Sequence, residues 1–191
     1  MNENETQVAV AERGPTDSGR KKSSDGMFFT FESDRKSYAI PVLEVVEIVA
    51  LPEITPVPDM PAYVKGLINL RGRVIPVIDI RIRFQFKQEE YHDRTCVVII
   101  SAGDKLVGLI VDAVSEVLRI PEDHFQSAPQ VGENTASRFI TATGIVNDSV
   151  FLVLDLPSLL NDRDFAPGAF ASLDQAATEV RQSNLFPPEA E

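Results

Sequence analysis

The chain has 191 residues, a formal net charge of −11 and a single cysteine. Its length accommodates one ordinary domain or two small ones, its acidity argues against binding along a nucleic-acid backbone, which requires a basic face, and one cysteine excludes a disulfide framework. Since no apolar run approaches the roughly 18 residues of a membrane-spanning helix and no secretory leader pattern opens the chain, we expect a cytoplasmic protein without direct membrane insertion.

The first 26 residues contain no aromatic side chain and few aliphatic ones. They cannot bury enough surface to offset the entropy of ordering, so we expect a disordered N-terminal tail over residues 1–26. From Met27 the runs FFTF and SYAIPV flank a polar turn and predict two strands. We expect a folded domain over residues 27–163 and a C-terminal tail over residues 164–191 that contains a short helix.

Residues 66–81, GLINLRGRVIPVIDIR, predict two buried strands joined by a glycine-containing turn. The turn presents Arg71 and Arg73 at the end of a rigid β-hairpin, which is an arrangement suited to recognising a partner molecule. Gly72 permits the positive φ that such a turn requires. Pro76 cannot donate to a ladder, so its strand is predicted to lie at an edge or to carry a bulge there.

The central part of the chain repeats itself. Residues 39–52 align with residues 108–121 at an offset of 69, and residues 74–80 align with residues 150–156 at an offset of 76. Short strands and frequent turns favour small barrels, and sustained helical periodicity is missing. We therefore expect an all-β fold of two related units, the first roughly over residues 27–90 and the second roughly over 94–163, with strands possibly exchanged between them, and a partner at their junction.

Catalytic and metal-binding interpretations have little support. His92 and His124 lack further ligands at metal-site spacing and are expected at the surface, and Cys96 opens an apolar run and is expected to be buried. Asp79 and Asp155 stand at equivalent places in the two copies, as in an aspartic protease, but without the Asp-Thr-Gly or Asp-Ser-Gly turn of that family. We expect them to make structural hydrogen bonds at strand ends. No phosphate-binding or nucleophile-elbow motif occurs, so we predict no enzyme, metal or cofactor.

Four segments resemble the CheW family of chemotaxis coupling proteins: YAIPVLEVVEIV, YVKGLINLRGRVIPVIDIR, VGLIVDAVSEVL and VFLVLDLPSLLN. The resemblance covers residues 28–161. It implies two packed five-stranded SH3-like barrels and a non-catalytic scaffold between chemoreceptor signalling tips and the regulatory domain of a CheA-type histidine kinase, recruited to membrane-associated receptor arrays. A coupling protein of a parallel chemosensory pathway, such as one governing surface motility, is the alternative within the family.

The resemblance also implies binding residues. For the receptor they are Val45, Glu47, Asn69, Arg71, Gly72, Val114 and Val117; for the kinase they are Val42 and Leu43, with Phe125 and Val131 at a second kinase contact. Exposed ion pairs contribute only about 0–1 kcal/mol. If Arg71 contributes to binding, it must therefore do so through partial burial, with its guanidinium bridging Glu47, a partner carboxylate or a backbone carbonyl. For each of the three valines in the receptor set, an ordinary place in the core remains an equal alternative.

Overall fold

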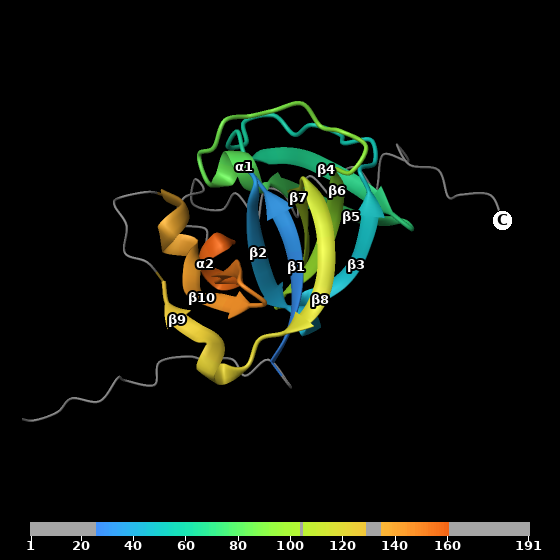
Figure 1. Ribbon diagram of the computed structural model, residues 1–191. Coiled ribbons are helices and arrows are strands. Elements are labelled where there is room, and N and C mark those ends of the chain that lie inside the picture. The colour runs from blue at the N-terminus through green and yellow to red at the C-terminus, as the bar shows by residue number, and fades with distance from the viewer. Residues whose placement is uncertain (1–25, 104, 129–134, 161–191) are drawn as a thin grey trace, which may run out of the picture.

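The computed structural model describes residues 26–103, 105–128 and 135–160 (Figure 1). The two predicted tails, apart from Gly26, the C-terminal helix and Val131 lie outside these residues. The described chain forms two β-sheets with a few short helical turns, as the all-β prediction requires.

The first sheet has six strands, and the second sheet has five. In spatial order the first sheet contains β8 (Ala113–Arg119), β1 (Met27–Ser33), β2 (Lys36–Pro41), β11 (Ser149–Leu154), β10 (Ile140–Val146) and β9 (Phe125–Ser127). The second contains β3 (Val45–Ala50), β6 (Cys96–Ala102), β7 (Lys105–Val111), β5 (Arg73–Asp79) and β4 (Val64–Leu70). The helical turns are η2 (Val42–Glu44), α1 (Ile80–Arg83), η3 (Glu122–His124), η4 (Thr135–Phe139) and α2 (Leu156–Leu159).

Sheet membership does not follow sequence order. After β2 the chain leaves the first sheet, and β3 pairs with β6 at the edge of the second; after β7 it returns, and β8 pairs with β1 at the edge of the first. Each sheet therefore contains strands from both copies of the sequence repeat. The edge strands β3 and β8 follow the two crossovers, at equivalent places in the repeat.

The repeat extends to irregularities of the backbone. The pairing of β3 with β6 shifts register between Val45 and Glu47, and the pairing of β8 with β1 places two residues, Ser115 and Glu116, opposite Thr30. These bulges are 69 residues apart, as the sequence alignment is. A bulge strengthens local twist and discourages further strand pairing, so both edges are protected in the same way.

Pro76 does not lie on an edge strand, so that alternative of the sequence prediction was wrong. Strand β5 lies between β4 and β7, and Pro76 faces Leu67. The ladder with β7 begins only at Val77, so the missing amide of Pro76 falls outside it. The register shift in this pair lies on β4, between Val64 and Gly66.

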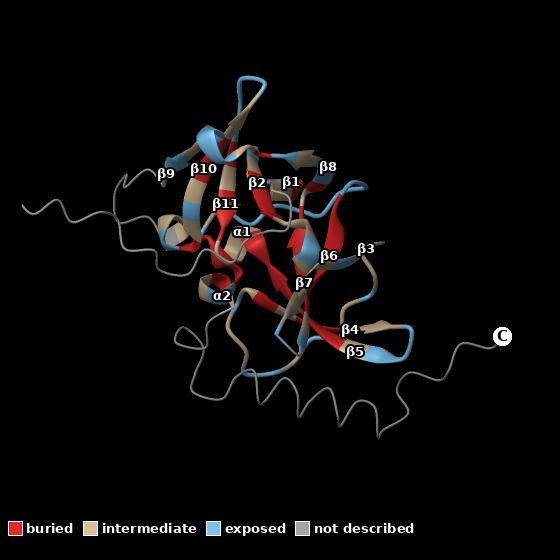
Figure 2. Cartoon of the chain, turned by 90° about the horizontal axis from the view of Figure 1, so that it is seen from below, coloured by how far each residue is buried: buried red, intermediate tan, exposed pale blue. Residues whose placement is uncertain are grey.

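A shared core joins the two sheets. The largest buried cluster combines Phe31 and Tyr38 of the first sheet with Ile100 and Leu109 of the second, and Figure 2 shows buried residues in strands of both sheets. The charged group of Arg83 is also buried here: Nε donates to the Leu159 carbonyl at 3.0 Å, which ties α1 to α2. Its guanidinium lies 4.6 Å from the ring centres of both Tyr63 and Phe139, so stacking compensates part of the cost of burial.

A second ionic cluster holds the crossover between β7 and β8. Asp112, at that crossover, accepts two hydrogen bonds of 2.6 Å from Arg81 and one of 2.9 Å from the Asp34 amide. The bonds to Asp112 raise the pKa of the Arg81 guanidinium above its ordinary value, so the guanidinium remains charged. The two parallel hydrogen bonds fix the direction as well as the distance between Arg81 and Asp112. They therefore position the start of β8 relative to α1.

Candidate functional site

Exposed aliphatic side chains gather on the two edge strands. Among the described residues seven large hydrophobic side chains are exposed, and five of them belong to η2, β3 and β8: Leu43 at 64%, Val46 at 54%, Ile48 at 43%, Val114 at 39% and Val117 at 46%. We call these five the β3/β8 face. Both strands lie on the same side of the molecule in Figures 1 and 2. Apolar side chains grouped in this way mark an interaction surface more often than isolated ones do.

An ion pair is held against β3 by the β4–β5 hairpin. Arg71 and Gly72 have φ angles of 51° and 78°, the left-handed pair that a tight hairpin turn requires. The Asn69 side chain accepts a hydrogen bond of 2.9 Å from the Gly72 amide and closes the turn. Arg71 Nη2 then donates to Glu47 Oε1 at 2.6 Å. The sequence prediction that Arg71 bridges to Glu47 agrees with this geometry.

The chain on its own does not bury Arg71. The Arg71 side chain is 77% exposed, against 28% for Glu47. An ion pair this exposed contributes little to stability. The guanidinium is instead oriented and accessible, with donors left over for a partner.

The three valines of the predicted receptor set differ in their exposure to solvent. Val114 and Val117 on β8 are exposed, whereas Val45 is half-buried and packs against the shared core. Side chains alternate along β3, so Val46 and Ile48 are exposed in place of Val45. Sequence reasoning missed these two residues. The repeat contained a signal for one of them, because it aligns Ile48 with the exposed Val117.

The residues of the predicted kinase contacts differ in exposure. Leu43 projects from η2 and is the most exposed of the large hydrophobic side chains described, while Val42 is half-buried against the shared core. Phe125 on β9 packs against Phe28, with ring centres 5.7 Å apart. Strand β9 is at the opposite edge of the first sheet from β8, so the second kinase contact would be a separate surface. The partner assigned to each residue stays a prediction.

The two carboxylates at equivalent places in the repeat have structural partners. Asp79 accepts from the amides of Arg81 at 2.9 Å and Ile82 at 3.3 Å, and from the Tyr91 hydroxyl at 2.8 Å. It therefore caps α1, as expected of a strand-end hydrogen bond. Asp155 accepts from the Ser158 hydroxyl instead of capping α2 through its side chain.

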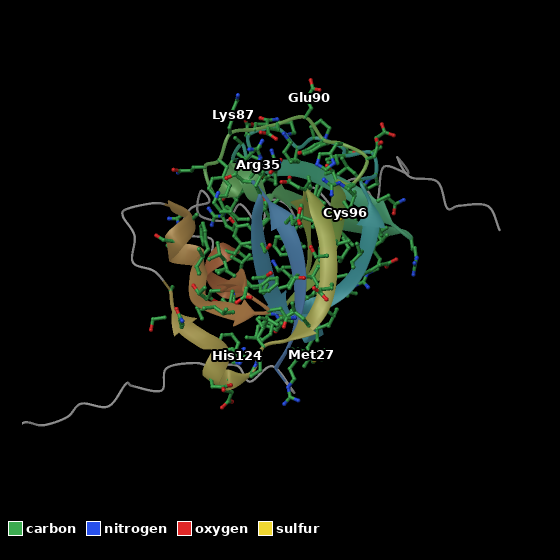
Figure 3. The ribbon with its side chains drawn as sticks, in the orientation of Figure 1. Met27, Arg35, Lys87, Glu90, Cys96 and His124 are labelled. Atoms are coloured by element: carbon green, nitrogen blue, oxygen red, sulfur yellow. The ribbon has the colours of Figure 1, made fainter. Side chains whose placement is uncertain are left out.

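The remaining candidate groups also have ordinary structural places. His124 is exposed on η3, with Nδ1 2.9 Å from the Ile145 carbonyl oxygen, and Cys96 is buried, which raises its thiol pKa (Figure 3). Within the described residues no group of three or more His, Cys, Asp or Glu side chains could hold a metal ion. None of the described helices is long and apolar enough to cross a bilayer.

An apolar face on two sheet edges, with an oriented ion pair on one of them, defines a protein that works by binding other proteins. Comparison with known proteins specifies which kind. The chain belongs to the CheW-like domain family, whose model matches residues 27–164. Scaffolding proteins of this family are non-catalytic, which excludes the protease alternative.

Individual relatives agree with this assignment. The chain is 30% identical over 139 residues to the chemotaxis protein CheW of Klebsiella aerogenes, covering 73% of this chain and 84% of that protein. It is 31% identical over 138 residues to the chemotaxis protein CheW of Helicobacter pylori, covering 72% and 82%. The crystal structure of the scaffolding protein TtCheW from Thermoanaerobacter tengcongensis superimposes with a TM-score of 0.67 at 29% identity, covering 72% of this chain and 93% of that one. The chain is thus a chemotaxis scaffold protein of the CheW family.

Proposed function

We propose that this chain couples chemoreceptor signalling tips to the regulatory domain of a CheA-type histidine kinase. The β3/β8 face carries the proposal, since it offers exposed aliphatic side chains beside a rigidly positioned arginine. Apolar contact supplies affinity when a partner covers it, and the charge of Arg71 selects the orientation of that partner. The chain would act in the cytoplasm and be recruited to membrane-associated receptor arrays by this contact.

The receptor site comprises Val114 and Val117 on β8 with Glu47 and Arg71 on the second sheet. Val46 and Ile48 extend it, because they are exposed on the same strand as Glu47. Asn69 and Gly72 contribute by fixing the turn that presents Arg71. Because the receptor site uses residues of both sheets, its geometry depends on how the sheets are placed relative to each other. The hydrogen bonds of Arg83 to Leu159 and of Arg81 to Asp112 fix that placement.

The kinase site begins at Leu43. This side chain is exposed and projects from a short helical turn between two strands, so a partner domain can cover it without disturbing the core. Val42 supports the turn from beneath. A bridging scaffold requires that receptor and kinase be bound together. Leu43 lies in η2, just before β3 and ahead of the residues assigned to the receptor.

Charge reversal at Arg71 tests the receptor assignment. Arg71→Glu places a second carboxylate beside Glu47, and at a binding hot spot we expect a loss of about 2 kcal/mol, or about 30-fold in receptor affinity. Affinity for the kinase regulatory domain should stay within twofold. Arg73→Glu is the matched control, because it makes the same charge change on the same exposed hairpin. Equal losses for both partners, or a receptor affinity within twofold of wild type, would contradict the assignment.

The same surfaces would serve a coupling protein of a parallel chemosensory pathway. Deletion of the gene separates the two possibilities, since loss of directed swimming indicates the first and loss of directed surface movement the second.

A further inference from the structure

One side of β8 faces the shared core, and the register of the sheet identifies the residues on it. Val117 pairs with Phe29 of β1, and Val114 pairs with Phe31. Both phenylalanines belong to the shared core, and residues paired across an antiparallel ladder point to the same side of the sheet. Arg119 lies two residues beyond Val117, so by alternation it also lies on this side.

The opposite edge, β3, is arranged in the same way. Ile48 and Ala50 pair with two residues of β6 that belong to the shared core, Val98 and Cys96. Figure 3 shows Cys96, the partner of Ala50, and Met27, the partner of Arg119, at opposite ends of the region between β3 and β8. The two edge strands therefore run in opposite directions along this region (Figure 1).

On the shared-core side, the two edges are equivalent in the sequence repeat except at one position. The repeat matches aliphatic residues on the two edges, Val45 with Val114 and Ile48 with Val117. It matches Ala50 with Arg119, so among the described residues on this side of β3 and β8 Arg119 is the one with a charge. A partner helix that packs between the edges meets similar apolar contacts in either direction, and Arg119 distinguishes the two directions.

The Arg119 guanidinium is available to a partner. The side chain is exposed, and no ion pair or side-chain hydrogen bond formed between described residues includes it. Its stem has a defined place beside the start of β1, because a Cβ atom at Gly26 would lie 4.0 Å from Arg119 Cγ. A guanidinium has N–H donors and no acceptor, and a carboxylate matches it best, through two parallel hydrogen bonds.

The spacing along β8 specifies where such a carboxylate belongs in a helical partner. Arg119 and Val117 are two residues apart on an extended strand, or about 7 Å. A helix rises about 1.5 Å per residue, so about four to five of its residues span this distance. Residues i and i+4 lie on one face of a helix. A helix that packs an aliphatic side chain on Val117 therefore reaches Arg119 with the residue one turn away on the same face.

We propose that Arg119 selects helical partners that carry a glutamate or aspartate one turn from the aliphatic residue that covers Val117, and so determines the direction in which they lie between β3 and β8. This inference rests on the proposed function, in which the partner is a receptor signalling tip. It adds a cation on the first sheet to the Arg71–Glu47 pair on the second.

The test titrates the full-length chain with a helical-hairpin fragment of a chemoreceptor signalling tip from the same bacterium. We expect Arg119→Glu to weaken binding at least tenfold, and Arg119→Gln to weaken it less and to reduce its salt dependence. Affinity for the kinase regulatory domain should stay within twofold. Lys87→Glu is the control, since it makes the same charge change at an exposed residue in the connection after α1, away from β3 and β8 (Figure 3). Thermal midpoints show which variants are folded, and Arg119→Gln, the smaller change, carries the test if the glutamate variant is not.

Charge exchange then identifies the contact. Each glutamate and aspartate of the receptor fragment is changed to lysine in turn and titrated against Arg119→Glu, and one of these changes, about four residues from an aliphatic residue of the same helix, should restore affinity. An Arg119→Glu affinity within twofold of wild type, an equal loss with Lys87→Glu, or the failure of every exchange would overturn the inference alone. A loss of kinase binding in place of receptor binding would do so as well. A wild-type chain that does not bind the receptor fragment would overturn the proposed function and this inference with it.

Discussion

Gly66 is the residue whose replacement tests the backbone geometry of the site most sharply. A Cβ atom at this position would lie 2.1 Å from the Thr55 carbonyl oxygen and 2.9 Å from Pro56 Cα, both of them backbone atoms. No side-chain rotation relieves such a contact, so Gly66→Ala must separate the two segments. Thr55 and Leu67 exchange two hydrogen bonds of 2.8 and 2.9 Å at this point, worth together about 1–3 kcal/mol.

The backbone conformation adds to that cost. Gly66 has a φ of 140°, where an alanine is strained by about 1–3 kcal/mol. The expected destabilisation is therefore about 2–6 kcal/mol, which lowers the thermal midpoint of a chain of this size by about 4–24 °C. Gly72→Ala is the control on the same hairpin: its φ of 78° is also strained, but no atom lies within 4 Å of the new methyl group. We expect about 1 kcal/mol there.

Calorimetry or circular dichroism during heating measures both midpoints. A Gly66→Ala midpoint within 2 °C of wild type, or equal to that of Gly72→Ala, would show that the close approach of β4 to Thr55 is not as described. The bulge that leads into the Arg71 hairpin would then need another explanation.

Two further predictions follow from exposure and from titration. Leu43→Glu should weaken binding to the kinase regulatory domain at least tenfold and change the unfolding free energy by less than about 0.5 kcal/mol. Val42→Glu should lower the unfolding free energy by about 1–3 kcal/mol, because only Val42 packs against the core. Urea unfolding and a binding titration measure both effects, and a Leu43→Glu variant that binds the kinase domain normally would remove this residue from the site. Burial raises the pKa of Tyr38, and burial with the hydrogen bond to Asp79 raises the pKa of Tyr91. Above the ordinary tyrosine pKa of about 10 the unfolded chain therefore loses protons that the folded chain keeps, so the unfolding free energy should fall as pH rises. Urea midpoints between pH 8 and 11.5 test this: Tyr91→Phe should show a shallower fall, and an equally steep fall would remove Tyr91 as a contributor.

Much of the fold could be predicted from local patterns. β-branched runs between polar turns indicated the strands, the repeat indicated two related β units, and the resemblance to the CheW family implied five strands in each. The repeat aligned Val45 with Val114, but the bulges that begin at these two residues were not predicted from it. Strand exchange was expected only as a possibility, and the identity of the exchanged strands, β3 and β8, could not be derived, because pairing depends on contacts between residues far apart in the chain.

The site was predicted in outline, and its errors have local causes. Glu47 and Arg71 meet as expected, because a two-residue turn with Gly72 leaves the arginine few other directions. Val45 and Val42 were predicted as contact residues, and both are half-buried against the shared core; each lies next to a backbone irregularity, a bulge in one case and a 3₁₀ turn in the other. Such features shift which neighbour faces the solvent by one residue. Val46, Ile48 and Leu43 are therefore the better candidates for contact.

Simultaneous binding is the most direct test of the central claim. Sedimentation velocity of an equimolar mixture of the chain, a receptor signalling fragment and the kinase regulatory domain measures whether one complex contains all three. We expect a ternary complex that loses the receptor fragment with Arg71→Glu and loses the kinase domain with Leu43→Glu. Competition, in which the receptor fragment displaces the kinase domain from the wild-type chain, would contradict the claim that this protein is a bridge between them.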